Sequence, residues 1–252
     1  RGPGTDSVVF RGEIGAEVGP DTSWIAQDEP GRLAGRALAM ALARRGIAVD
    51  GPVVVMRPPE SALGGATGGP EVRVAWRSAP LSAVARIALE QSDNWVTEQV
   101  LKTLGAREGA GSWSGGTAVV ERFLAERVGV DAAAMYLRDG SGLTPQTLLT
   151  PAAIGALLRY AATRPWSAVY RDALVSPGEP ESTLEDRLVA YGDRVAAKTG
   201  TLRHINALSG YAVRRGGDTV VFSILTNASG RPSSEMQRAL DRIVEAILES
   251  GS

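Results

Sequence analysis

The sequence predicts a protein of mixed α/β (α+β) class, in which an antiparallel sheet with flanking helices lies beside a helical subdomain. Two apolar β-type runs, at residues 205–213 and 220–226, are separated only by the polar, glycine-containing residues 214–218, a pattern typical of an antiparallel hairpin. Ser233 or Ser234 then caps a last helix, whose apolar stripe would pack on the sheet. Its members are Met236, Leu240, Ile243, Val244, Ile247 and Leu248.

Helical patterns predict the helical part at about residues 80–190. Pro80 opens a helix that runs to Gln91, and after residues 92–94 a second helical run continues to Gly105. The triplet at 92–94 is therefore expected at a junction between two helices, where short polar side chains can face a cleft. Ser92 or Asp93 could instead cap the second helix, a role that is compatible with one in the cleft.

The rest of the helical part is punctuated by glycine and proline. Residues 109–116 are rich in glycine and are predicted to form a loop. Thr150 followed by Pro151 predicts a helix start, because threonine caps well and proline fits the first helical position. Residues 165–187 are predicted to be irregular with short helices.

The first part of the chain carries weaker patterns. Residues 7–27 suggest extended segments and turns, and from Asp28 an apolar stripe predicts a helix that contributes only core packing. Short strands are expected at residues 51–55 and 72–76. The four glycines between residues 61 and 70 indicate a surface loop.

Composition excludes several classes of function. The 252 residues are 44% hydrophobic and 22% charged, with a net charge of −1 and scattered arginines, which argues against nucleic-acid binding. The absence of cysteine removes disulfides and thiol nucleophiles, and a lone histidine leaves too few favoured ligands for zinc. Neither a metal nor another cofactor is expected. A Ser-His-Asp triad would depend on that histidine, His204, for which a surface polar role is favoured.

A Lys-Thr-Gly triplet at residues 198–200 directly precedes the predicted hairpin. Of the 27 Lys and Arg residues, 25 are Arg, and the only lysines are Lys102 and Lys198. In a chain that otherwise uses Arg, Lys198 indicates a site that needs a compact ammonium instead of a planar guanidinium. On this triplet alone, a strand-end lysine without function explains the pattern about as well.

A second triplet, Ser-Asp-Asn at residues 92–94, changes that balance. The two triplets occur together with a Ser-x-x-Lys in class A β-lactamases and penicillin-binding proteins. Residues 139–144 (Asp-Gly-Ser-Gly-Leu-Thr) lie between them, and residues 207–211 (Ala-Leu-Ser-Gly-Tyr) follow. Together these motifs resemble the D-alanyl-D-alanine carboxypeptidase/endopeptidase family of low-molecular-mass penicillin-binding proteins, in the class with large inserted domains. The resemblance implies the penicillin-recognising serine-transferase fold, which β-lactamases and DD-peptidases share.

The resemblance also implies catalytic residues. Ser92 would relay a proton between the nucleophile and the leaving group, and Asn94 would hydrogen-bond the backbone amide of the substrate. Lys198 would hold positive potential over the cleft and keep the proton relay in order. The implied reaction is acyl transfer, in which a serine attacks the D-Ala-D-Ala peptide bond and water hydrolyses the ester.

Substrate-binding residues follow from the same resemblance at Thr199, Gly200 and Thr201. The hydroxyls of Thr199 and Thr201 would bind the terminal carboxylate of the substrate. The backbone N–H of Thr201 would be one of two oxyanion donors, a group worth about 3 kcal/mol in transition-state stabilisation. A cationic pocket lined by hydroxyls suits a small carboxylate even without the resemblance, because charge-assisted hydrogen bonds are the strong ones.

The Ser-x-x-Lys of the family is absent from the sequence, since Gln99 and Val195 stand three residues before the two lysines. We therefore expect the C-terminal portion of a D,D-peptidase, whose nucleophile is on a removed segment or on a second chain. Residues 1–27 would be the end of an inserted domain or connecting strands. Residues 28–252 would be the C-terminal part of the peptidase domain, with its sheet part at about 28–79 and 191–252.

Two alternatives remain open at this point. One is a non-catalytic peptidoglycan-binding or scaffold protein of the same fold, and the other is a β-lactamase-like hydrolase. The expected ligands are a peptidoglycan stem peptide ending in D-Ala-D-Ala and β-lactam antibiotics, and the family resemblance implies a periplasmic or otherwise extracytoplasmic location. No apolar run is long enough for a transmembrane helix, and no signal peptide is recognisable.

Overall fold

The computed structural model describes residues 9, 11–13, 15–17, 19, 27–55, 77–109 and 111–251. The chain divides into two units, Arg1–Glu71 and Val72–Ser252, each of which is described by itself. The predictions for residues 61–70 and 72–76, and most of those for residues 7–27, lie outside the described residues. The assignment of residues 28–79 to the sheet part therefore stays a prediction.

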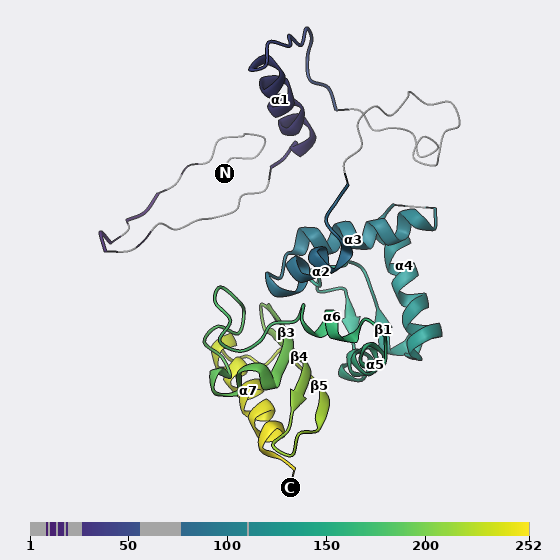
Figure 1. Cartoon of the computed structure of the whole chain (residues 1–252), viewed down its shortest axis with the longest axis vertical. Helices are drawn as coiled ribbons and strands as arrows, with labels where there is room; N and C mark the ends of the chain where they lie inside the picture. Colours follow the sequence, from purple (N-terminus) through teal and green to yellow (C-terminus); the bar gives the residue numbers. More distant parts are fainter. Residues whose placement is uncertain are drawn as a thin grey trace. The chain divides into compact units, whose positions relative to one another are not determined.

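The first unit contains one described helix, α1 (Pro30–Ala43), which appears in Figure 1. The helix begins one residue later than the cap at Asp28 would predict, with Glu29 at the cap position and Pro30 in the first turn. Its predicted core role is wrong for the part of the chain that the structure describes, because no residue of α1 is buried and Leu38 is 61% exposed. The strand predicted at residues 51–55 is not formed, and Val53 instead lies against Gly35 of α1.

The second unit is built on a three-stranded antiparallel sheet with the order β3-β4-β5. Its strands are β3 (Val195–Leu202), β4 (Ile205–Val213) and β5 (Thr219–Asn227). The predicted hairpin of β4 and β5 is confirmed, and β3 adds the Lys-Thr-Gly triplet at the edge of the sheet, with Lys198 opposite Ser209.

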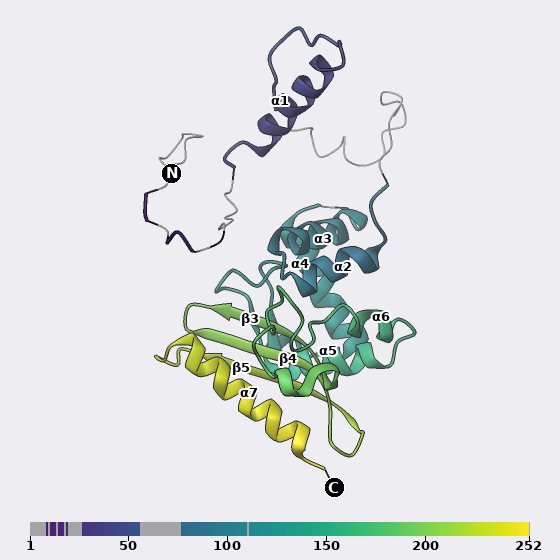
Figure 2. The same ribbon diagram turned by 60° about the vertical axis from the view of Figure 1, so that its left-hand side comes forward.

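The C-terminal helix α7 (Ser233–Glu249) covers one face of the sheet, as Figure 2 shows. Leu240, Val244 and Leu248 of this helix are buried in a core that includes alternate residues of the strands, such as Val195 and Leu208. The predicted stripe is thus confirmed at its centre. It is wrong at Ile243, which is 47% exposed.

The helical region packs on the opposite face of the sheet. Tyr211 of β4 points into this side, is only 1% exposed, and donates a hydrogen bond of 2.8 Å to the carbonyl of Leu158. The helices are α2 (Leu81–Glu90), α3 (Asn94–Arg107), α4 (Trp113–Phe123), α5 (Pro151–Ala162) and α6 (Ser167–Arg171). Shorter elements are η2 (Leu124–Val128), η3 (Ala132–Ala134), β1 (Met135–Tyr136), β2 (Leu148–Leu149) and η4 (Val189–Arg194).

The helix boundaries follow the sequence signals except at a glycine-rich stretch and at the start of α7, where the predicted cap at Ser233 or Ser234 is wrong because Pro232 holds the cap position and no side chain caps the helix. Thr150 accepts a hydrogen bond from the N–H of Ala153 and so caps α5 as predicted. The loop predicted at residues 109–116 is wrong in its second half, because Ser112 caps α4 and the helix runs through Gly116. A side chain at Gly116 would collide with Leu101 of α3, so glycine is needed for the close approach of α3 and α4.

Candidate functional site

The Lys-Thr-Gly and Ser-Asp-Asn triplets lie next to each other in the structure. The Nζ atom of Lys198 donates a hydrogen bond of 2.8 Å to the Oγ atom of Ser92 and another of 2.9 Å to the carbonyl of Thr199. The first bond joins residues that are 106 positions apart in the sequence. The structure therefore brings together two of the residues that the sequence singled out.

Ser92 lies at the junction of α2 and α3 in a strained conformation. Its φ angle is +55°, in the left-handed region that non-glycine residues rarely adopt. Asp93 fixes this junction by accepting a 2.9 Å hydrogen bond from the N–H of Val96, which caps α3. The predicted capping role thus belongs to Asp93 and leaves the Ser92 hydroxyl for Lys198. Strain of this kind is commonly retained at functional sites.

Burial affects the pKa of Lys198. Because its ammonium group is largely removed from water, the pKa of Lys198 is lowered from the ordinary lysine value of 10.5. An ammonium with a lowered pKa gives up a proton more readily than an exposed one. Hydrogen-bonded to a hydroxyl, the ammonium can give a proton to that hydroxyl during a reaction, and the neutral amine that results can take a proton back.

The edge of β3 is open beside this pair. Val175 forms a bridge to Ala197, with hydrogen bonds of 2.9 and 3.0 Å in both directions. Backbone groups of a strand alternate between its two sides, so Thr199 and Thr201 turn their N–H and C=O groups to the same side as Ala197. The register with β4 supports this assignment. The alternate residues Lys198 and Gly200 lie opposite Ser209 and Ala207, and it is their backbone groups that face β4. The N–H of Thr201 is therefore aimed away from the sheet.

The hydroxyls of Thr199 and Thr201 each form a hydrogen bond with a residue that the sequence did not suggest. Thr199 donates a 2.7 Å hydrogen bond to the hydroxyl of Thr183, in the irregular segment before η4. Thr201 accepts a 3.3 Å hydrogen bond from the side-chain amide of Gln237 on α7. Gly200 is exposed between the two threonines.

Asn94 is the first residue of α3 and is exposed. Its side chain lines a pocket of about 500 Å³. The pocket also includes Trp95, which is 71% exposed, and residues of the Asp-Gly-Ser-Gly-Leu-Thr segment. In the structure this segment, which lies between the two triplets in the sequence, lies beside Asn94.

Glu98 holds this segment in place. Its carboxylate accepts hydrogen bonds from the backbone N–H groups of Gly140 and Ser141, from the Ser141 hydroxyl and from the indole N–H of Trp113. Glu98 comes four residues after Asn94, so both lie on one face of α3. That spacing is the signal that could have identified Glu98 from the sequence.

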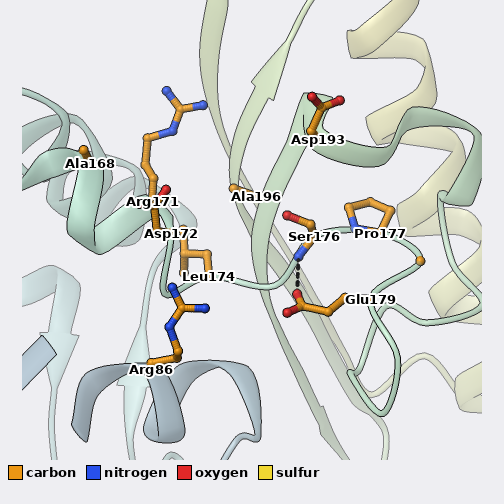
Figure 3. A pocket seen from close by; sticks show the side chains of 11 residues that line it. Arg86, Ala168, Arg171, Asp172, Leu174, Ser176, Pro177, Glu179, Asp193 and Ala196 are labelled. Atoms are coloured by element: carbon orange, nitrogen blue, oxygen red, sulfur yellow. Dashed lines mark hydrogen bonds between the residues drawn. The ribbon is translucent and has the colours of Figure 1, made fainter. Parts of the chain in front are cut away.

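A second pocket, of about 680 Å³, lies on the face of β3 that carries Ala196. Figure 3 shows Arg86 of α2 and Arg171 of α6 on its helical side, and Asp193 and Glu179 on the other. The N–H of Ser176 donates a 3.3 Å hydrogen bond to Glu179 within this pocket. None of the predicted site residues lines it.

His204 does not join Ser92 and Lys198 in the structure. It lies exposed in the turn between β3 and β4, and its backbone carbonyl accepts a 2.9 Å hydrogen bond from the N–H of Ala228. This supports the surface role that the sequence favoured. Within the described ranges no group of three His, Cys, Asp or Glu residues could hold a metal ion, and no helix is long and apolar enough to cross a membrane.

Comparisons with known proteins agree with the motifs. A D-alanyl-D-alanine carboxypeptidase from Actinomadura sp. is 34% identical over 240 residues, which are 91% of this chain and 43% of that protein. Carboxypeptidase DacB from Mycolicibacterium smegmatis is 31% identical over 227 residues, or 86% of this chain and 46% of that protein. The chain thus spans less than half the length of these two relatives.

Solved structures show the same fold at lower sequence identity. Penicillin binding protein 4 (dacB) from Haemophilus influenzae matches with a TM-score of 0.77 and 19% identity, over 90% of this chain and 53% of that one. The TLA-3 extended-spectrum β-lactamase matches with a TM-score of 0.54 and 17% identity, over 87% of this chain and 82% of that one. The predicted penicillin-recognising serine-transferase fold is thereby confirmed. The model of the D-Ala-D-Ala carboxypeptidase 3 (S13) family matches residues 1–247, and the chain belongs to this family.

Proposed function

We propose that this chain supplies the second and third motifs of a serine-type D-Ala-D-Ala carboxypeptidase or endopeptidase that forms an acyl-enzyme on peptidoglycan peptides and binds β-lactams. The observation that carries the proposal is the 2.8 Å hydrogen bond between Lys198 Nζ and Ser92 Oγ. It places an ammonium with a lowered pKa against a hydroxyl at the open edge of a strand. Membership of the carboxypeptidase family supports the same reaction.

In this proposal Ser92 and Lys198 have different roles in proton transfer. Ser92 passes a proton from the attacking serine hydroxyl to the leaving amine, and Lys198 keeps the Ser92 hydroxyl oriented and the site positive. Asn94 hydrogen-bonds the backbone amide of the substrate with its side-chain amide, which offers both donors and an acceptor. Asn94 lies at the start of α3, two residues after Ser92.

The edge of β3 binds the part of the substrate that carries negative charge. The N–H of Thr201 donates to the oxyanion that develops when the carbonyl is attacked. The hydroxyls of Thr199 and Thr201, with Gly200 between them, line the site for the terminal carboxylate of the D-Ala-D-Ala peptide. A ligand lying along the edge of β3 could reach both groups, because residues 199 and 201 face the same side of the strand.

The nucleophilic serine and its lysine are missing from these 252 residues. In this proposal they come from a Ser-x-x-Lys on another segment or on a second chain, and the reaction takes place outside the cytoplasm, in the periplasm or the cell wall. The Haemophilus influenzae relative has been solved with a bound β-lactam, which supports penicillin as the probe.

Intact-mass spectrometry of the protein purified from its source organism, before and after incubation with a penicillin, tests the proposal. A covalent adduct on a polypeptide that carries a Ser-x-x-Lys and is associated or continuous with this chain supports it. An adduct on a serine within these 252 residues would contradict the assigned mechanism. Absence of any adduct would contradict the enzymatic function and favour a non-catalytic peptidoglycan-binding protein of the same fold.

A further inference from the structure

Two hydrogen-bonded pairs lie side by side on the end of β3. The hydroxyl of Thr199 donates to the hydroxyl of Thr183 at 2.7 Å, and the side-chain amide of Gln237 donates to the hydroxyl of Thr201 at 3.3 Å. Thr199 and Thr201 are two residues apart on one strand, so their side chains are on the same face. Four polar side chains from three separate segments therefore surround one exposed edge.

Thr183 is held at this edge by buried structure. Its neighbour Leu184 is fully buried in the core beneath α7, and the carbonyl of Leu184 accepts a 3.0 Å hydrogen bond from the N–H of Gly178. Arg187, four residues after Thr183, forms two hydrogen bonds of 2.7 and 3.1 Å with Asp241 of α7. Packing on both sides of Thr183 along the chain therefore holds its backbone beside the end of β3.

The directions of the hydrogen bonds leave two hydroxyl protons free. Thr199 gives its proton to Thr183, so the proton of Thr183 can go to a further acceptor. Gln237 gives an N–H to the oxygen of Thr201, so the proton of Thr201 can also go to an acceptor. An ionised carboxylate accepts hydrogen bonds and donates none, and it therefore fits this arrangement.

We propose that Thr183 and Gln237 complete the site for the terminal carboxylate of the peptide substrate, an inference that rests on the function proposed above. Thr183 is a binding residue, whose hydroxyl donates to the carboxylate. Gln237 is a positioning residue, which occupies the acceptor side of the Thr201 hydroxyl and keeps its proton for the ligand. Lys198 adds positive potential at the same place, because its Nζ lies 2.9 Å from the carbonyl of Thr199.

The test compares two peptides that end in D-Ala-D-Ala, one with a free carboxylate and one with a C-terminal carboxamide. Dissociation constants for both are measured by calorimetry on the native protein and on Thr183→Val, Thr183→Ser and Thr219→Val. Thr219 is an exposed threonine at the start of β5, opposite Val213, and serves as the matched control. The measured quantity is the preference for carboxylate over carboxamide.

We expect Thr183→Val to reduce this preference about tenfold, because a hydrogen bond to a charged group is lost. Thr183→Ser keeps the hydroxyl and should retain most of the preference, and Thr219→Val should retain all of it. Gln237→Glu should reduce the preference more than Gln237→Met, since a carboxylate at residue 237 would take the proton of Thr201 and repel the ligand.

The outcomes separate this inference from the function on which it rests. Binding with an unchanged preference in Thr183→Val, or an equal loss of affinity for both peptides, would overturn the role of Thr183 and leave the proposed function standing. A preference that is the same in Gln237→Glu and Gln237→Met would overturn the role of Gln237. If the unmodified protein binds neither peptide, the proposed function fails, and the inference fails with it.

Discussion

The hydroxyl of Ser141 donates a hydrogen bond of 2.6 Å to the carboxylate of Glu98, 43 residues earlier in the chain. The same carboxylate accepts the indole N–H of Trp113 at 2.7 Å and the backbone N–H of Ser141 at 3.0 Å. One side chain of α3 thus joins α4 to the turn that lines the pocket beside Asn94. The carboxylate of Glu98 therefore holds together three of the segments that line the pocket.

Substitution of Glu98 should therefore lower stability and change its pH dependence. Burial alone would raise the pKa of the Glu98 carboxyl, but hydrogen bonds from Ser141, Gly140 and Trp113 outweigh burial and lower the pKa below its ordinary value of 4.5. The stabilisation is present above pH 4.5 and is lost as the pH falls through the lowered pKa. Glu98→Gln should cost about 1–2 kcal/mol at pH 7.

Urea unfolding of the unmodified protein and of Glu98→Gln at several pH values measures this effect. The difference in unfolding free energy between the two proteins should shrink as the pH falls from 5 toward 3. Glu121→Gln is a useful comparison, because Glu121 accepts a single hydrogen bond from the N–H of Leu137. A constant difference across the pH range would contradict the role assigned to the Glu98 charge.

The pKa of Lys198 can be measured directly because the chain has only two lysines. Reductive methylation with ¹³C-formaldehyde should give two lysine signals in an NMR spectrum, and a Lys102→Arg variant identifies the signal of Lys198. We expect the Lys198 signal to titrate below pH 10.5, since burial disfavours the charged form. Titration at or above pH 10.5 would contradict the burial of the ammonium group.

The lowered pKa of Lys198 also has a predictable effect on stability. A base whose pKa is lower in the folded state binds fewer protons there than in the unfolded state, so stability rises with pH between the folded and unfolded pKa values. Below this pH range Lys198 is charged in both states, and burying its ammonium group lowers the free energy of unfolding. Lys198→Met should therefore remove this rise in stability at alkaline pH, which thermal unfolding between pH 8 and 10.5 would show.

Much of the sheet and the central pair could be predicted from the sequence, because both depend on local patterns. The alternating runs of β4 and β5 and the helical stripe of α7 fix the sheet and its cover. The Ser92–Lys198 pair was expected because its two triplets resemble motifs that occur together in penicillin-binding proteins. Neither required knowledge of how distant irregular segments fold.

The residues that the sequence did not reveal depend on packing between remote segments. Thr183 lies in an irregular stretch without periodicity, and the burial of Leu184 together with the Arg187–Asp241 pair holds it near Thr199. Gly116 looked like part of a loop because glycine disfavours helices, but its contact with Leu101 overrides that propensity. The strand expected at residues 51–55 had apolar side chains but no described partner strand.

The ion pair between Arg187 and Asp241 should matter more for stability than the exposed pairs of the same helix. Both side chains are mostly buried, at 16% and 15% exposure, and the guanidinium binds the carboxylate through two nitrogen atoms. Arg187→Ala leaves a partly buried carboxylate unpaired and should cost about 2–3 kcal/mol. Arg187→Lys should recover only part of this, because an ammonium cannot form the two parallel bonds.

Arg231, two residues before α7, and Glu235 in the first turn of α7 provide a matched control. Their side chains are 67% and 47% exposed and their closest charged atoms are 3.4 Å apart, so Arg231→Ala should cost less than about 0.5 kcal/mol. Chemical denaturation of the two alanine variants compares the two pairs. Equal losses would show that the Arg187–Asp241 pair does not anchor the segment that carries Thr183.

Penicillin acylation offers the sharpest comparison between the two lysines. Lys198 hydrogen-bonds Ser92, whereas Lys102 lies on α3 with its ammonium 3.6 Å from the centre of the Trp113 ring. In the native protein, Lys198→Ala should slow acylation by at least about a hundredfold, the usual contribution of a positioned proton-transfer group. Lys102→Ala removes the same charge from the chain and should change the rate by less than about threefold, since an exposed cation–π contact is weak.

The rate of formation of the covalent adduct, followed by intact mass against time, measures both variants. Equal effects of the two substitutions would mean that Lys198 acts only through the net charge of the protein, and the assignment of the Ser92–Lys198 pair as the proton-transfer site would then be wrong.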